Sequence, residues 1–137
     1  MDRLILIGYL GKDAELRYTP DGRQICQFSV AASRKWKSKE GEVKTRTNWY
    51  RCQLWGRRGE ALLPYLEKGI RVSIIGRLNG DEHGGPRVWQ AEDGSARASF
   101  EVVVEDLELL GGGSSHGAAP KAAAGENDFS DIDFGEF

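Results

Sequence analysis

Tryptophan and basic side chains gather in one stretch of this chain, residues 34–58. Nine of its residues are basic and two are acidic, so it carries a net charge of +7, whereas the whole chain carries −2. Three of the four tryptophans, Trp36, Trp49 and Trp55, lie in the same stretch. Aromatic rings stack on unpaired bases, each stack contributing about 1–3 kcal/mol, while cations meet the phosphates. The combination predicts contact with single-stranded nucleic acid.

The second half of this stretch alternates as a β-strand does, with two sets of side chains on opposite faces. One set is expected to line a core and consists of Tyr50, Cys52 and Leu54. The other set puts two tryptophans and a cation in one row and consists of Trp49, Arg51, Gln53 and Trp55. The alternative is a packed surface with both faces covered, since tryptophan is usually at least partly buried. The cations of the row disfavour it, because burying charge is costly.

Charge divides the 137 residues into two unlike parts. Residues 1–110 hold 18 Lys and Arg against 16 Asp and Glu, a net charge of +2, and residues 111–137 hold one Lys against five acids, a net charge of −4. The overall pI of about 5.7 is therefore a poor guide to partners. The length allows one domain and a tail.

Neither a membrane segment nor a metal site is expected. No apolar run reaches the ~18 residues that span a bilayer, and the first residues lack the features of a signal peptide, so we expect a cytoplasmic protein without membrane partners. Cys26 and Cys52 fall on inward strand positions and are expected to be buried reduced thiols. Their spacing matches no metal motif, and neither His83 nor His116 lies near them in sequence, so no metal or cofactor is expected.

Five strands are expected, over Leu4–Leu10, Gln24–Ser33, Thr47–Trp55, Ile70–Leu78 and Ala98–Leu110. Gly8 is expected to mark a bulge or a close approach, 20–22 a turn, and 39–42 a hairpin tip. Residues 60–69 form the one helical pattern, with Pro64 near its first turn and Gly69 as its end cap. Residues 79–97, with Arg87 and Trp89, are expected to form a long loop or hairpin. Because Trp36 shares the inward parity of Phe28, we expect a bulge or twist before it to turn it outward.

This order predicts an all-β fold: a five-stranded antiparallel OB barrel with one short helix, followed by a disordered C-terminal tail. The OB domain is expected to cover 1–110, a flexible Gly/Ser/Ala linker 111–125, and an acidic tail 126–137. Apolar residues among the tail's acids favour a protein-docking peptide over a merely solubilising segment.

Several motifs, in this order and spacing, resemble the bacterial single-stranded DNA-binding protein family. They are LIGYLGKDAELRY at 6–18, FSVA at 28–31, TNWYR at 47–51, LWGR at 54–57 and YLEKG at 65–69. The resemblance implies a homotetramer that wraps single-stranded DNA, without catalysis, at the bacterial nucleoid. It also implies a role in DNA replication, recombination and repair, with partner proteins recruited through the tail. Departures from the family pattern are Tyr9, Tyr50 and the missing Ile-Pro step near the C-terminus.

The resemblance also assigns site residues. Its stacking aromatics correspond to Trp36, Trp49, Trp55 and Trp89. Its phosphate-facing cations correspond to Arg3, Arg51, Arg57, Lys68, Arg77 and Arg87, with Arg17, Arg34, Lys35 and Lys37 as helpers. The protein-docking residues of the tail are Asp131, Ile132, Asp133, Phe134 and Phe137.

Two other functions remain to be weighed. An enzyme would need clustered carboxylates or a nucleophile with a base. The dense acids of the domain read better as a solvated strand edge: Glu101, Glu105, Asp106 and Glu108. The alternative is an OB-fold adaptor that binds RNA or protein, for instance within a primosome, and comparing binding to single-stranded DNA, duplex DNA and RNA would distinguish it.

Overall fold

The computed structural model describes residues 1–112, so residues 113–125 of the predicted 111–125 linker and the whole predicted tail, with its docking residues, lie outside the described part. The elements are β1 (Leu4–Leu10), β2 (Glu15–Tyr18), β3 (Gln24–Lys37), β4 (Val43–Trp55), α1 (Arg57–Leu62), the 3₁₀ helix η1 (Leu63–Tyr65), β5 (Ile70–Leu78), β6 (Arg87–Gln90) and β7 (Ala96–Gly112). All five expected strands are present, and β3, β4 and β7 run longer than expected.

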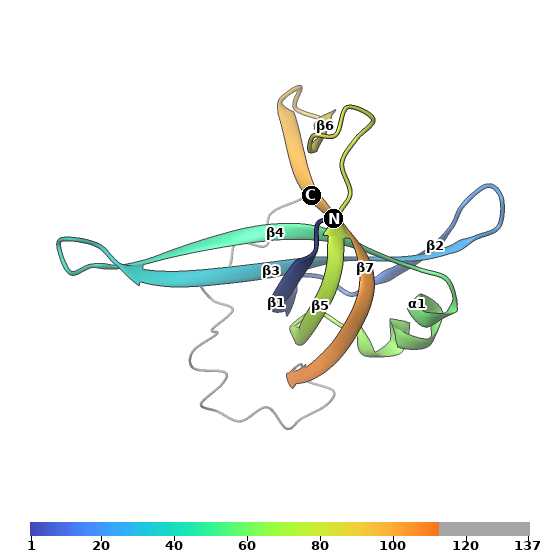
Figure 1. The fold of residues 1–137 in the computed structure, drawn as a ribbon, viewed down its shortest axis with the longest axis horizontal. Helices are drawn as coiled ribbons and strands as arrows, with labels where there is room; N and C mark the ends of the chain where they lie inside the picture. The colour runs from blue at the N-terminus through green and yellow to red at the C-terminus, as the bar shows by residue number, and fades with distance from the viewer. Residues whose placement is uncertain (113–137) are drawn as a thin grey trace.

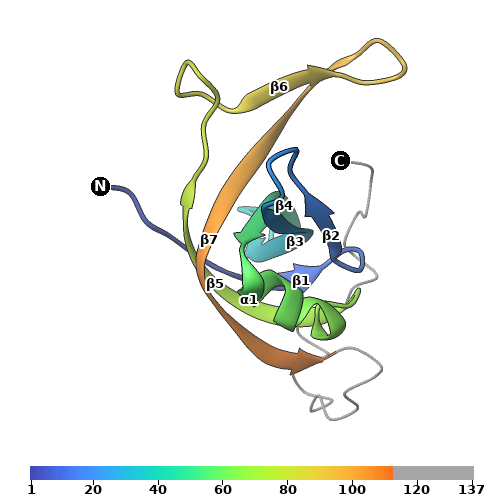
Figure 2. The same cartoon turned by 90° about the vertical axis from the view of Figure 1, so that its right-hand side faces the viewer.

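The strands close into a barrel. The sheet order is β1-β5-β7-β4-β3-β2, and β1 also pairs with β3 through Tyr9–Ala31 and Leu10–Val30. The contact between β4 and β7 is parallel, and the other pairings are antiparallel. Figure 2 shows the long curved strands β5 and β7 beside β1, with α1 at one end. The predicted all-β OB barrel with one short helix is confirmed.

Alternation along β3 and β4 supplies much of the core. Cys26, Phe28 and Val30 are buried, as are Cys52 and Leu54 on the neighbouring strand, and they join one cluster with side chains of β1, β5 and β7. The apolar side chains pack inward because burial removes them from water. The expected inward faces of both strands are therefore confirmed within the barrel.

Gly8 marks a close approach, as expected from the sequence. A Cβ atom there would lie 2.3 Å from the carbonyl oxygen of Ala31 and 2.9 Å from Cγ1 of Val30. Only glycine leaves room for β1 and β3 to converge at this corner of the barrel.

Three extensions project from the barrel: the β3–β4 hairpin, the β2–β3 turn and the β6–β7 hairpin (Figure 1). The part of the β3–β4 hairpin that lies beyond the barrel, residues 33–47, is called the arm below. Its side chains are mostly exposed on both faces. The loop or hairpin expected over 79–97 is a hairpin, in which β6 pairs with the start of β7.

Trp36 is exposed, as expected, but no bulge precedes it. The β3–β4 register runs without a shift from Ile25–Trp55 to Lys37–Val43, so the expected bulge before Trp36 is wrong. Trp36 keeps the inward parity of Phe28 and is still 41% exposed, because the arm extends past the core. Its face of the hairpin is thus opposite to that of Trp49.

The helix begins earlier and ends earlier than the sequence pattern predicts. α1 covers Arg57–Leu62, and Pro64 falls in the first turn of the separate 3₁₀ helix η1. Proline lacks the N–H that a continuing helix would need and fits the start of a new one. Gly69 has the expected positive φ of 91°, but it lies in the turn that leads into β5.

The acids of β7 do not form one solvated edge. Glu101 is buried at 6% exposure, so that prediction is wrong for it, whereas Glu105, Asp106 and Glu108 are exposed. The pairing of β5 with β7 shifts register at Glu105, which is the extra residue of a β-bulge. The bulge changes the parity of the strand, which simple alternation does not anticipate.

Candidate nucleic-acid interface

One outer face of the sheet crosses five strands. Residues that pair across strands point to the same side, so the register defines its rows. One row runs from Glu15 through Gln27, Gln53 and Val103 to Arg77, and the next joins Ser29, Arg51 and Glu101. Trp49 and Trp55 lie on the same face of β4, paired with Ala31 and Ile25.

Within the described part of the chain, the rings of Trp36, Trp55 and Trp89 each have a guanidinium nearby. The Arg23 Cζ atom lies 4.9 Å from the centroid of Trp55, that of Arg51 lies 5.9 Å from Trp89, and that of Arg34 lies 6.0 Å from Trp36. The Arg51–Trp89 contact joins β4 to the β6 hairpin. Such cation–π contacts place a charge for a phosphate beside a ring for a base.

Several arginines on and around the barrel are held by acids, although Arg51 and Arg77 of the outer face have no ion pair within residues 1–112. The ion pairs are Arg17–Glu15 at 2.9 Å, Arg23–Asp21 at 3.1 Å, Arg58–Asp106 at 3.1 Å, Arg87–Glu101 at 3.7 Å and Arg3–Glu105 at 3.8 Å. Glu101 is the buried member, and it also accepts a hydrogen bond from Nε2 of Gln53 at 3.4 Å. A buried carboxylate needs such partners, and here they hold Arg87 at the face.

The cations of the arm have no such partners. Among residues 1–112, no ion pair involves any of its six exposed cations: Arg34, Lys35, Lys37, Lys39, Lys44 and Arg46. Exposed lysine and arginine side chains without carboxylate partners are free to meet phosphates.

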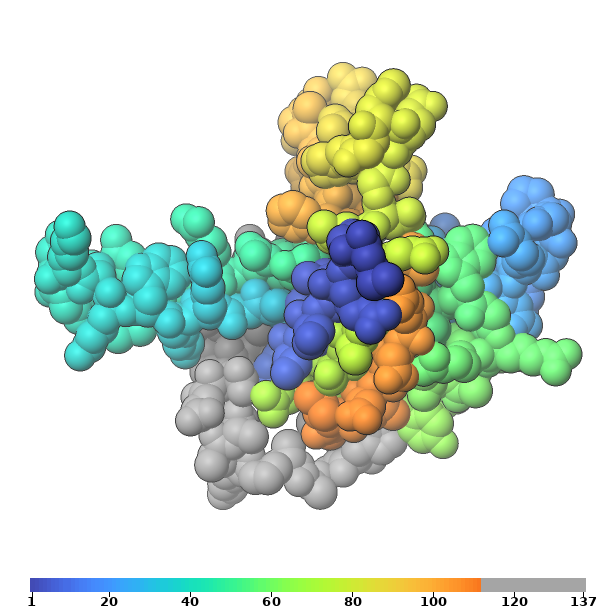
Figure 3. Space-filling view, viewed as in Figure 1, coloured from blue at the N-terminus to red at the C-terminus, as the bar shows by residue number. Residues whose placement is uncertain are grey.

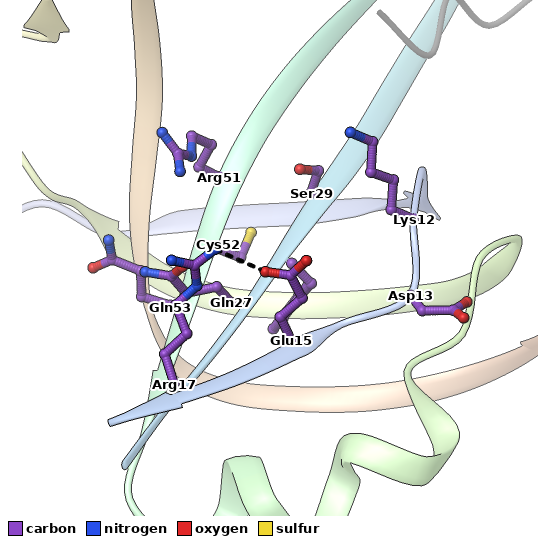
Figure 4. A pocket seen from close by; sticks show the side chains of 10 residues that line it. Lys12, Asp13, Glu15, Arg17, Gln27, Ser29, Arg51, Cys52 and Gln53 are labelled. Atoms are coloured by element: carbon purple, nitrogen blue, oxygen red, sulfur yellow. Dashed lines mark hydrogen bonds and ion pairs between the residues drawn. The ribbon is translucent and has the colours of Figure 1, made fainter. Parts of the chain in front are cut away.

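A pocket of about 210 Å³ opens on the outer face above β2, β3 and β4 (Figure 4). Its lining includes three cations, two acids and two amides that come from these strands and the β1–β2 loop: Lys12, Arg17, Arg51, Asp13, Glu15, Gln27 and Gln53. It is smaller than the ~300 Å³ at which ligand pockets usually begin, and it is lined by charged and polar groups. It therefore suits a segment of a chain that lies across the face rather than an enclosed small molecule.

Half of the fourteen predicted DNA-binding residues share this surface. The outer face and its β6 rim hold Trp49, Trp55, Trp89, Arg17, Arg51, Arg77 and Arg87. The arm holds Trp36, Arg34, Lys35 and Lys37. Arg3 instead lies beside Glu105, Arg57 begins α1, and the backbone N–H of Lys68 donates to Asp13 Oδ1 in the turn before β5.

Sequence reasoning did not single out Arg23, Lys12 or Gln27 as site residues. Gln27 could have been found from its parity, because it alternates with the buried Cys26 and Phe28. Arg23 lies beyond the strand, and its contact with Trp55 depends on the geometry of the preceding turn. No pattern in the sequence signals that contact.

Burial keeps both thiols in the protonated form. Desolvation raises the pKa of Cys26 to about 11, and it raises the pKa of the more deeply buried Cys52 further. Both cysteines are free, as expected. Within residues 1–112, no cluster of His, Cys, Asp and Glu could hold a metal ion, and no helix has the length and apolar character to cross a membrane.

Comparison with known proteins decides the family. Residues 1–110 match the model of the single-strand binding protein family. The chain belongs to this family. The single-stranded DNA-binding proteins of two Neisseria meningitidis strains, of serogroups A and B, are each 36% identical over 121 residues, which cover 88% of this chain. The match spans 66% of the length of those relatives.

Solved structures show the same barrel. The Plasmodium falciparum SSB in complex with ssDNA matches with a TM-score of 0.64 and 25% identity, over 81% of this chain and 96% of that one. A deletion mutant of the single-stranded DNA binding protein from Thermus aquaticus matches with a TM-score of 0.62 and 26% identity, over 81% of this chain and 51% of that one.

Proposed function

We propose that this protein binds single-stranded DNA without sequence preference and protects it during replication, recombination and repair. The observation that carries the proposal is the set of three arginine–tryptophan contacts, spread over the outer face, the β6 hairpin and the arm. Every base has a face that stacks on a ring, and every nucleotide has a phosphate for a cation, so such a surface favours no base sequence. The family and the ssDNA complex of the Plasmodium falciparum relative support this proposal.

The path of the strand follows from where the rings lie. A strand crossing the outer face would pass Trp55, the pocket and Trp49, with Trp89 and Arg87 at the rim of the β6 hairpin. To reach Trp36 it would have to pass around the arm, because Trp36 lies on the opposite face of that hairpin. The proposed contact residues are those that the sequence analysis named.

Comparative binding tests this function. Equilibrium titration of labelled single-stranded DNA, duplex DNA and RNA of one length, at several salt concentrations, should show the tightest binding to single-stranded DNA. Affinity should fall steeply with salt, because bound cations release condensed counterions. Tighter binding to RNA, or a flat salt response, would instead favour the RNA- or protein-binding adaptor.

We also propose that copies of the chain associate, as a homotetramer. β1 presents Ile5 and Ile7 on its outer side, 69% and 51% exposed, and its Leu4–Gly8 part pairs only with β5 among the described strands. Figure 3 shows β1, in dark blue, at the surface beside β5 and β7. An exposed apolar row on an open strand edge fits burial against a second copy. Light scattering should give the mass of four chains, and Ile7→Glu should lower it.

The tail's role is a further part of the proposal. Residues 126–137 would recruit replication and repair proteins, with 111–125 as a linker from a DNA-binding domain at 1–110. The first two residues of this linker, Gly111 and Gly112, form the end of β7. Deleting 130–137 should leave DNA binding unchanged or slightly tighter at low salt and should abolish capture of such partners. We propose no catalytic activity, and a cytoplasmic location at the nucleoid.

A further inference from the structure

Arg23 and Trp55 form the closest of the three cation–ring contacts, at 4.9 Å. Arg23 directly precedes β3 and Trp55 ends β4, and two neighbouring backbone contacts join these segments. Ile25 pairs with Trp55, and the backbone N–H of Gly56 donates to the carbonyl oxygen of Gln24 at 3.0 Å. The end of β4 and the start of β3 therefore hold the ring and the guanidinium in one place.

The turn before Arg23 is closed by its own hydrogen bonds. The N–H of Thr19 donates to the carbonyl oxygen of Arg23 at 2.8 Å, and the N–H of Arg23 donates to Oγ1 of Thr19 at 3.0 Å. Gly22 takes a positive φ of 87° that other residues rarely adopt. The position of Arg23 is thus set by the turn before any ligand arrives.

Asp21 holds the guanidinium from the side. Its Oδ2 accepts from Nε of Arg23 at 3.1 Å, while Oδ1 accepts a hydrogen bond from the hydroxyl of Thr19. The hydrogen bond from Thr19, followed by the charge of Arg23, lowers the pKa of Asp21, so this carboxylate is ionised at neutral pH. No other hydrogen bond of the Arg23 side chain is found within residues 1–112, which leaves most of its five N–H donors unused.

The ring of Trp55 remains accessible for stacking by a DNA base. It is 37% exposed even with Arg23 in place, and it lies on the outer face that the proposed DNA path crosses. A guanidinium beside an open indole offers one nucleotide both of its contacts, a ring for the base and N–H donors for the phosphate.

We propose that Arg23 and Trp55 form a preassembled site for one nucleotide, in which Asp21 competes with the phosphate for the guanidinium. The proposal rests on single-stranded DNA binding as the function. The carboxylate keeps Arg23 in position when the site is empty, and it lowers the affinity for DNA because the phosphate must displace it or share the guanidinium with it. Arg23 is then a contact residue in its own right, and Asp21 adjusts the affinity of the site.

Substitutions of the two charges should act in opposite directions. Arg23→Gln should weaken binding of oligo(dT) about 5-fold near 0.1 M salt and reduce the slope of log affinity against log salt by about 0.7, as expected for one lost phosphate contact. Asp21→Asn should tighten binding about 2- to 3-fold. That gain should shrink when Arg23 is already Gln, because the competition no longer exists. Arg23→Lys should keep the salt slope but not the full affinity, since lysine lacks the planar fork.

A double-mutant cycle tests the proposal directly. The full chain, both single variants and the double variant are titrated with labelled oligo(dT) at four salt concentrations, with Glu40→Gln as the control for loss of one exposed acid. Arg23 and Asp21 side chains are 68% and 63% exposed, so the fold should survive, and thermal melting checks it. If the parent fails to bind, the proposed function itself is wrong. If the parent binds and Arg23→Gln binds equally well, or more tightly because Arg23 shields the ring, the inference is overturned. Additive effects of the two substitutions would likewise overturn the competition.

Discussion

The arm and the barrel face carry their positive charge in different ways. The six arm cations have no ion pair among the described residues, whereas Arg17, Arg23 and Arg87 at the barrel face each contact a carboxylate. The arm also lacks a core beneath it, so its side chains are exposed on both faces. The barrel face is supported by buried strands and arranged by short-range contacts.

This difference suggests separate roles: the arm attracts DNA, and the barrel face positions its nucleotides. Unpartnered cations on a projecting hairpin produce a strong local field that draws a polyanion from solution. Arginines already held by acids add less net charge, because each must exchange a carboxylate for a phosphate. They can instead fix where a nucleotide lies. We therefore expect the arm to dominate the salt dependence and the barrel face to dominate the order of the bound strand.

The largest effect should come from removing charge on the arm. A variant with Arg34, Lys35, Lys37 and Lys44 changed to Gln should lower the slope of log affinity against log salt by about 2.8, if each contacts one phosphate. Affinity near 0.1 M salt should fall on the order of 100-fold or more. Equilibrium titration at four salt concentrations measures both. An unchanged slope would mean that the arm does not meet the DNA.

Replacing the stacking rings should have the next largest effect. Trp55→Ala and Trp49→Ala should each cost about 1–3 kcal/mol of binding free energy with a nearly unchanged salt slope, because a ring carries no charge. Quenching of tryptophan fluorescence by oligo(dT) follows the same titration. Trp36→Ala is the matched variant on the arm. Parent-like binding by both barrel variants would show that the outer face is not the binding face.

Stability should distinguish the regions in a different way. Gly8→Ala forces a methyl group against Ala31 and Val30 and should destabilise the barrel by about 1–3 kcal/mol. Lys35→Ala on the arm should leave the melting temperature unchanged, because the side chain is exposed. Thermal melting by circular dichroism compares the two. Equal melting temperatures for both variants would contradict the close approach at Gly8.

The smallest effect should come from single acids. Glu15→Gln releases Arg17 from an exposed ion pair and should tighten DNA binding by about 0.2–1 kcal/mol at low salt. Glu40→Gln removes the same charge at the end of the arm, where no ion pair is present among residues 1–112, and should change affinity less. Parallel titrations at low salt compare them. A larger gain from Glu40→Gln would reverse the distinction between the regions.

Alternation predicted the strands of the barrel well because a core lies under them. Cys26, Phe28 and Val30 point inward as their spacing requires. The same rule was wrong where the core ends, and Trp36 is exposed with no irregularity in register. It was also wrong for Glu101, which the sequence analysis placed at a solvated edge. Burial depends on the neighbouring strands, and the carboxylate of Glu101 contacts Gln53 of β4 and Arg87 of β6.

The site was predicted in its residue types more than in its contacts. The tryptophans and basic residues of 34–58 were visible as a cluster, whereas the acid partners of some arginines come from a strand distant in sequence. Arg87 meets Glu101, and Arg58 meets Asp106. Such pairs depend on which strands meet when the barrel closes, and the alternation of residues along the sequence does not predict that.

The parallel contact between β4 and β7 has a consequence for how the chain folds. Tyr50 pairs with Phe100, so barrel closure must bring together residues fifty positions apart, and the loop-closure entropy opposes it. The β3–β4 hairpin needs only the short turn at 38–42 and can form first. Contacts of long sequence separation slow folding, so we expect docking of β7 to limit the rate. On the ribosome, the basic hairpin would then be complete while its barrel still waits for the last strand to be synthesised.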